Sequence, residues 1–127
     1  MLSVAMPKPT RVPRPHEPVR GSRTGRPIMA LLDLLGRRWA LRLLWELREG
    51  PATFRELRER CDDVSPTVLN DRLRELRETG ILELERGEGF RVTESGASLL
   101  LALAPLNAWA AAWARRQDRR GKTRAAS

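Results

Sequence analysis

The chain has 127 residues, with 24 Lys and Arg against 16 Asp and Glu and a formal net charge of +8. This length suits one domain with a modest hydrophobic core, and the positive charge favours an anionic partner. A single cysteine, Cys61, excludes an internal disulfide, and one histidine with one cysteine cannot supply a structural zinc site, so we expect no metal and no other cofactor.

The positive charge is concentrated at the two ends of the chain. Residues 28–114 hold 12 Arg against 14 Asp and Glu, whereas 1–27 and 115–127 each hold six basic residues and one acidic residue. Both ends have too little apolar surface to offset the entropy lost on ordering, so we expect two largely disordered basic tails around a folded domain at 28–114. The tails either attract phosphates without regard to base sequence or only keep the protein soluble. The sequence leaves both alternatives open.

Several classes of protein are disfavoured by what the sequence lacks. No N-terminal segment has the apolar core of a signal peptide, and no stretch reaches the roughly 18 apolar residues of a membrane span, so we expect a cytoplasmic protein with no membrane partner. There is no set of nucleophile, base and orienting group, and no Gly-rich phosphate loop. We therefore do not expect an enzyme.

Two apolar helices are predicted before Pro51. Apolar residues recur at helical spacing over 28–35 and stop at Gly36, which is favourable just beyond a helix end. The next segment, 38–49, places its apolar residues largely on one side and ends at Gly50, directly before the proline.

Two helices with clear N-terminal signals follow. Thr53 and Glu56 have the spacing of a capping box, in which each side chain satisfies a free backbone N–H. Ser65 is a natural N-cap and Pro66 a natural first helical residue, and an apolar leucine stripe then runs to Gly80. A helix buried by its leucines must present its polar residues outward.

The rest of the ordered chain is predicted to be a hairpin and a long helix. Residues 81–86 and 90–93 can pair as strands, with Leu82 and Leu84 facing Phe90 and Val92. Thr93 can cap a last helix that stays apolar over several turns and contains Pro105, which should kink it. A long apolar helix at the end of a small domain requires a partner surface.

The order of these elements predicts a mainly α fold with a small β-hairpin, a winged helix-turn-helix. In such folds the helix that begins here at Ser65 lies in a DNA groove. Asn can pair with adenine and Arg with guanine, and Asp can accept from cytosine N4. The predicted contact residues on this helix are Ser65, Thr67, Asn70, Asp71 and Arg74.

Three further arginines have separate interpretations. Arg86 and Arg91 flank the wing and suit phosphates, although lone exposed arginines are usually only solvated. Arg72 lies closer to the leucine stripe and is expected to pair with an acidic neighbour within the protein. The alternative for the whole helix is an ordinary solvated face with Arg74 and Glu78 as an i,i+4 pair.

Four segments occur in a characteristic order and spacing. They are Leu32 to Trp39, Phe54 to Leu57, Ser65-Pro66 followed by Leu69 and Arg72 to Leu76, and Thr93 to Gly96, with Pro105 and Trp113 in the last helix. In these segments the sequence resembles the HxlR-type regulators, a bacterial branch of winged-helix transcription factors related in architecture to the MarR group. The resemblance covers about residues 26–114.

The resemblance implies a homodimer joined through the first and last helices, which binds a near-palindromic operator and regulates nearby genes. The implied dimer contacts are Ile28, Leu31, Leu32, Leu106, Trp109 and Trp113. A small-molecule effector in a cavity between paired helices is possible.

The chain departs from the family in two places. Several members sense electrophiles or oxidants through a cysteine just before the first helix, and Arg26-Pro27-Ile28 stands there instead. The wing is also shorter than the family's Pro-Pro-containing hairpin.

Cys61 shares a face with Phe54 and is expected to be a small buried hydrophobe.

A rival function has the same fold. A winged-helix protein can bind another protein, or coat DNA without reading its sequence through Arg-rich tails. The acidic balance of residues 28–114 keeps this rival open, because a sequence-specific binder usually has a basic stripe on its folded domain.

Overall fold

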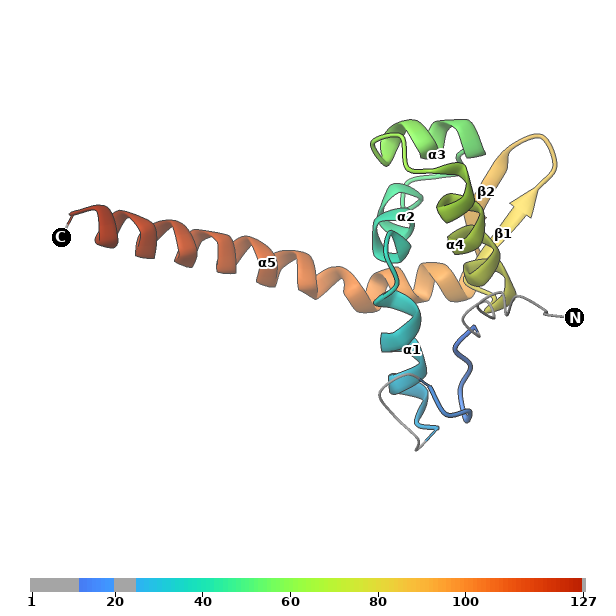
Figure 1. Ribbon diagram of the computed structural model, residues 1–127, viewed down its shortest axis with the longest axis horizontal. Helices are drawn as coiled ribbons and strands as arrows, with labels where there is room; N and C mark the ends of the chain where they lie inside the picture. The colour runs from blue at the N-terminus through green and yellow to red at the C-terminus, as the bar shows by residue number, and fades with distance from the viewer. Residues whose placement is uncertain (1–11, 20–24, 127) are drawn as a thin grey trace, which may run out of the picture.

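The part of the chain that the structure describes forms five helices and one antiparallel hairpin, in the order that the sequence predicts (Figure 1). The computed structural model describes residues 12–19 and 25–126. The elements are α1 Pro27–Leu35, α2 Ala40–Glu46, α3 Phe54–Arg60, α4 Pro66–Glu78, β1 Leu82–Glu85, β2 Gly89–Val92 and α5 Glu94–Ala126.

One hydrophobic core joins α1 to α4 with the hairpin. It is built mainly from leucines, which α4 contributes at helical spacing as Leu69, Leu73 and Leu76, each at most 2% exposed. Leu43 and Leu57 bring α2 and α3 onto the same core. The burial of this stripe determines which side of α4 faces solvent.

The predicted helix starts are confirmed. Thr53 and Glu56 form the complete capping box at α3, with hydrogen bonds of 3.0 and 3.1 Å. The Ser65 hydroxyl accepts from the Val68 N–H at 3.2 Å at the start of α4. Thr93 accepts from the Gly96 N–H at 3.0 Å and so begins α5.

The hairpin brings the predicted apolar residues together, and its register places Leu82 opposite Val92 and Leu84 opposite Phe90. The sequence did not indicate that Ala52 adds a third strand-like segment, exchanging two backbone hydrogen bonds of 2.9 and 2.8 Å with Phe90. Gly89 permits this approach, because a Cβ there would lie 2.4 Å from the Ala52 carbonyl oxygen. The wing is therefore anchored to the segment before α3.

The second helix is shorter than the predicted 38–49. Trp39 adopts a left-handed backbone conformation (φ +75°) directly before α2, so the helix begins at Ala40, and it ends at Glu46. An L-residue in this region cannot continue a right-handed helix.

The predicted disorder of the C-terminal tail is wrong. Helix α5 continues through 115–126 and extends far beyond the other elements, at about 50 Å in length (Figure 1). Arg, Gln and Lys are good helix formers, and adding residues to an existing helix avoids the cost of nucleation. Pro105 lies within the helix without ending it.

Helix α5 also corrects the prediction that no segment is long and apolar enough to cross a membrane. Over Glu94–Lys122 it meets both criteria, and none of its most apolar window is buried in a single chain. Length and composition alone are weak evidence for a span. They do show that α5 carries apolar surface that this chain does not cover.

The N-terminal tail lies partly on the domain. Val12 is 7% exposed, and the Arg14 guanidinium lies 3.9 Å from the Glu78 carboxylate of α4. For 12–19 the structure therefore contradicts the predicted disorder, whereas 1–11 and 20–24 lie outside the described residues.

Candidate nucleic-acid interface

The outward side of α4 carries most of the side chains predicted to contact DNA. Ser65, Thr67, Asn70 and Arg74 are exposed, and Asp71 is half-buried. They share this side because the leucines of the helix face the core. The structure adds Arg77, which is exposed one turn beyond Arg74 and was not among the predicted residues.

Loose ion pairs balance the charge on this face. Arg74 lies 3.7 Å from Asp71 and 3.7 Å from Glu78, and all three side chains are at least 40% exposed. Exposed pairs of this kind contribute little to stability. A phosphate or a base edge can therefore replace the carboxylates as the partner of Arg74.

The two wing arginines differ. Arg91 lies 2.6 Å from both Glu83 and Glu85 on the facing strand, and its hydrogen bond to Glu83 raises the pKa of the guanidinium. Arg86 is exposed beside the turn of the hairpin. Of the two, Arg86 is the better placed to meet a phosphate.

Arg72 points inward, as predicted. Its guanidinium bonds the Glu75 carboxylate, and its Nε–H donates to the Arg38 carbonyl oxygen at 2.8 Å. Glu75 is 2% exposed and also bonds Arg37. Sequence reasoning missed this buried carboxylate, because a glutamate in a polar helix normally indicates a solvated position.

An apolar surface runs over α1 and α5, on the residues that the family resemblance implied for dimer contact. Ile28, Leu32, Leu106 and Trp109 are 55–58% exposed, and Leu31 is half-buried. Trp109 stacks on Trp113 with ring centroids 6.1 Å apart. Large apolar residues exposed in this number are typical of an interaction surface.

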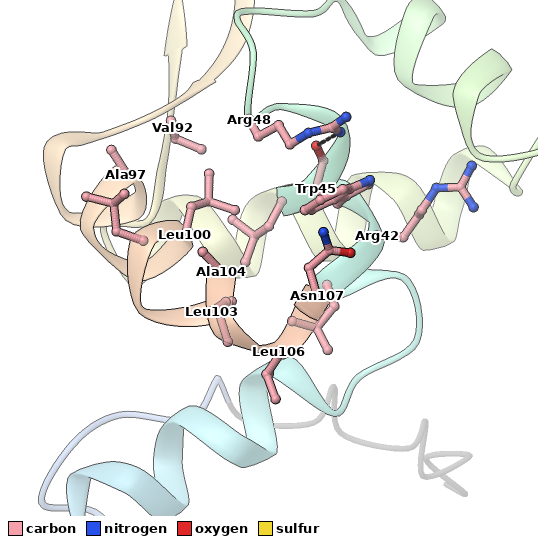
Figure 2. A pocket seen from close by; sticks show the side chains of 13 residues that line it. Arg42, Trp45, Arg48, Val92, Ala97, Leu100, Leu103, Ala104, Leu106 and Asn107 are labelled. Atoms are coloured by element: carbon pink, nitrogen blue, oxygen red, sulfur yellow. Dashed lines mark hydrogen bonds between the residues drawn. The ribbon is translucent and has the colours of Figure 1, made fainter. Parts of the chain in front are cut away.

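The surface continues into a groove between α2 and the first half of α5 (Figure 2). Trp45 faces side chains of α5 across this groove, which has a volume of about 810 Å³. Leu41, Trp45 and Leu101 are 47%, 42% and 77% exposed. These three residues were not predicted to belong to an interface.

Cys61 is fully buried in the core, as predicted. Burial raises the pKa of its thiol, mainly through desolvation. A thiol must ionise to act as a nucleophile. Its position is therefore that of a structural side chain.

These observations define a winged helix-turn-helix protein: a capped, outward-facing α4, a hairpin beside it, and a long terminal helix with an apolar surface. The chain belongs to the HxlR-like helix-turn-helix family, which matches residues 34–118. The protein is a DNA-binding transcriptional regulator.

Similar proteins come from bacteria. The HTH-type transcriptional regulator YodB of Bacillus subtilis strain 168 is 31% identical over 84 residues, which are 61% of this chain and 75% of YodB. A crystal structure of quinone-bound YodB matches with a TM-score of 0.61 at 31% identity, and the match covers 65% of this chain and 93% of the YodB chain. A MarR-family regulator from Enterococcus faecalis V583 has a TM-score of 0.62 at 30% identity, with coverage of 72% and 89%.

Proposed function

We propose that the protein is a cytoplasmic homodimer that reads a near-palindromic operator with one α4 helix from each subunit. The single observation that carries this proposal is the division of α4 into two sides. The leucines are fully buried, and Thr67, Asn70 and Arg74 are exposed on a helix whose start is fixed by the Ser65 cap. Base contacts require side chains that are exposed and held in one register.

The proposed dimer covers the apolar surface of α1 and α5. A two-fold dimer needs one self-complementary patch, and here exposed aliphatic residues of α1 and tryptophans of α5 occur in the same chain. We extend the predicted interface to Leu41, Trp45 and Leu101, because the groove that they line is continuous with Leu106. The second copy is the occupant that we assign to this groove.

The dimer proposal is tested by light scattering coupled to size-exclusion chromatography. Leu101→Glu and Trp113→Glu each place a charge on the proposed interface and should convert a dimer to a monomer. Arg55→Glu, on the exposed side of α3, is the control and should leave the dimer intact. If both interface variants stay dimeric, the copies meet elsewhere, and the groove is open to a small apolar effector or a membrane surface.

Sequence-specific DNA binding is tested by in vitro selection. A pool of random duplexes is enriched on the full-length protein, and the proposal predicts two inverted copies of one short sequence at fixed spacing. Enrichment without a common sequence would support the rival function, in which basic segments bind DNA without regard to its bases.

A further inference from the structure

A buried ion cluster connects the DNA-reading helix to the end of the first helix. Glu75 of α4 is 2% exposed, and its two carboxylate oxygens have different partners: Oε2 accepts from Arg37 and Oε1 from Arg72. Arg37 belongs to the α1–α2 connection, whereas Arg72 belongs to α4. The carboxylate therefore joins two parts of the chain that are 38 residues apart.

Further contacts extend the cluster on both sides. Arg37 also lies 3.6 Å from Asp33 of α1, and the Arg72 Nε–H donates to the Arg38 carbonyl oxygen at 2.8 Å. The next residue, Trp39, has its backbone in the left-handed region, so the chain changes direction at this carbonyl. Arg37 and the Arg38 carbonyl thus contact α4 directly, and Asp33 links Arg37 to α1.

The cluster suits orientation better than stability. The leucine stripe already buries α4, and a buried ion pair often contributes less stability than apolar residues of similar volume. Charged hydrogen bonds are, however, short and directional, and Arg presents its donors in a rigid fork. Such contacts restrict the angle of α4 against α1 more narrowly than leucine packing does.

We infer that Glu75 is a positioning residue that sets the spacing between the two operator half-sites. The inference rests on the proposed function, in which α1 contributes to the dimer interface and α4 enters the DNA. The angle between these helices then sets the distance between the two recognition helices, which in dimeric helix-turn-helix proteins must match one helical turn of DNA or a multiple. Glu75 contributes to specificity without touching a base.

The experiment measures tolerance to half-site spacing. Duplexes selected on the wild-type protein are rebuilt with the spacer one base pair shorter and one longer, and the affinity for each is measured by fluorescence anisotropy at constant salt. Full-length wild type is compared with Glu75→Gln, which removes the charge, and Arg37→Lys, which keeps the charge but loses the fork. Glu59→Gln is the matched control, because Glu59 pairs with Arg55 at 3.7 Å on the exposed side of α3, outside the groove and the ion cluster.

We expect both cluster variants to reduce the preference for the selected spacer by roughly threefold or more, with the half-site sequence unchanged. The control should keep the wild-type preference. A merely structural role would lower the melting temperature and leave the preference intact, and that result in a folded variant overturns the inference. If Glu75→Gln does not fold, Arg37→Lys decides. If wild type selects no paired half-sites, the proposed function itself fails and the inference with it.

Discussion

Arg74 and Asn70 occupy the same exposed side of α4 but differ electrostatically. Arg74 has two carboxylates at 3.7 Å, whereas Asn70 is a neutral amide on the same face. Exposed ion pairs of this kind contribute about 0–1 kcal/mol each, so DNA can displace them at small cost. Both residues are therefore available for base contact.

Substitution of either residue should reduce specific binding. We expect Asn70→Ala and Arg74→Ala each to weaken binding to the selected operator by about 1–3 kcal/mol, because each would remove a base contact. Binding to a scrambled duplex should change little for Asn70→Ala. Fluorescence anisotropy on both duplexes measures this difference.

Arg55→Ala serves as the control for these two variants. Arg55 has the same kind of loose pair, 3.7 Å from Glu59, but lies on α3. Any phosphate contact that it makes carries no sequence information, so the ratio of specific to scrambled affinity should not change. If all three variants keep the wild-type ratio of specific to scrambled affinity, Asn70 and Arg74 do not contact bases.

Cys61 gives a second prediction at the residue scale. Because the thiol is buried and its pKa is raised, we expect Cys61 not to react with peroxide or a maleimide in the native protein. In urea it should react completely, and mass spectrometry measures the extent of reaction in both conditions. The folded protein holds the thiol proton to higher pH than the unfolded chain. The stability contributed by this difference is complete below the unfolded pKa of about 8.5 and is lost as the pH rises above it. A native adduct, or stability independent of pH in this range, would contradict the assignment.

Among the elements, those with local signals were predicted and those that depend on distant contacts were not. The Thr53–Glu56 box and the Ser65-Pro66 start lie within a few consecutive residues, so their geometry follows from sequence spacing. The bridge from Ala52 to Phe90 is a single residue without periodicity. The burial of Glu75 depends on arginines, one of which lies 38 positions away. No local pattern indicates such contacts.

The wing gives a prediction at the element scale. Gly87 and Gly89 both have positive φ angles, +84° and +102°, but only Gly89 has a neighbour in the way of a Cβ. Gly87→Ala should lower the free energy of unfolding by roughly 1–2 kcal/mol through backbone strain alone. Gly89→Ala should cost more, because the new Cβ would overlap the Ala52 carbonyl.

Urea unfolding and operator affinity distinguish the two alanine variants. Gly89→Ala should also weaken DNA binding, because it displaces the wing from Ala52. Gly87→Ala should bind DNA with an affinity closer to that of wild type. Equal stability of the two variants would show that the Ala52 contact does not hold the wing in place.

At the scale of the whole molecule, the basic charge of the C-terminal end lies away from the proposed DNA-binding face of α4 (Figure 1). The domain at 28–114 is slightly acidic, and the C-terminal basic residues continue α5 away from the wing (Figure 1). The sequence predicted the charge division but not the helical form of this end, because 115–127 has no apolar periodicity. Its helix continues from the apolar half of α5.

Truncation after Ala114 separates the contribution of the C-terminal basic charge from sequence-specific DNA binding by α4. Removing 115–127 takes away six basic residues and one acidic residue. We expect the salt dependence of DNA binding to become gentler, by about 0.9 in the logarithmic slope for each phosphate that the tail neutralises in the full-length protein. The preference for the operator over a scrambled duplex should persist. Disappearance of all sequence preference would instead place DNA recognition in the tail.

Whether α4 recognises base sequence is tested by one anisotropy titration. The full-length protein is titrated at physiological salt with the duplex selected from a random pool and with a scrambled duplex of equal composition. We expect a preference of roughly 10³-fold or more for the selected duplex, the range of specific protein–DNA complexes. Equal affinity for the two duplexes, falling steeply with salt, would contradict it.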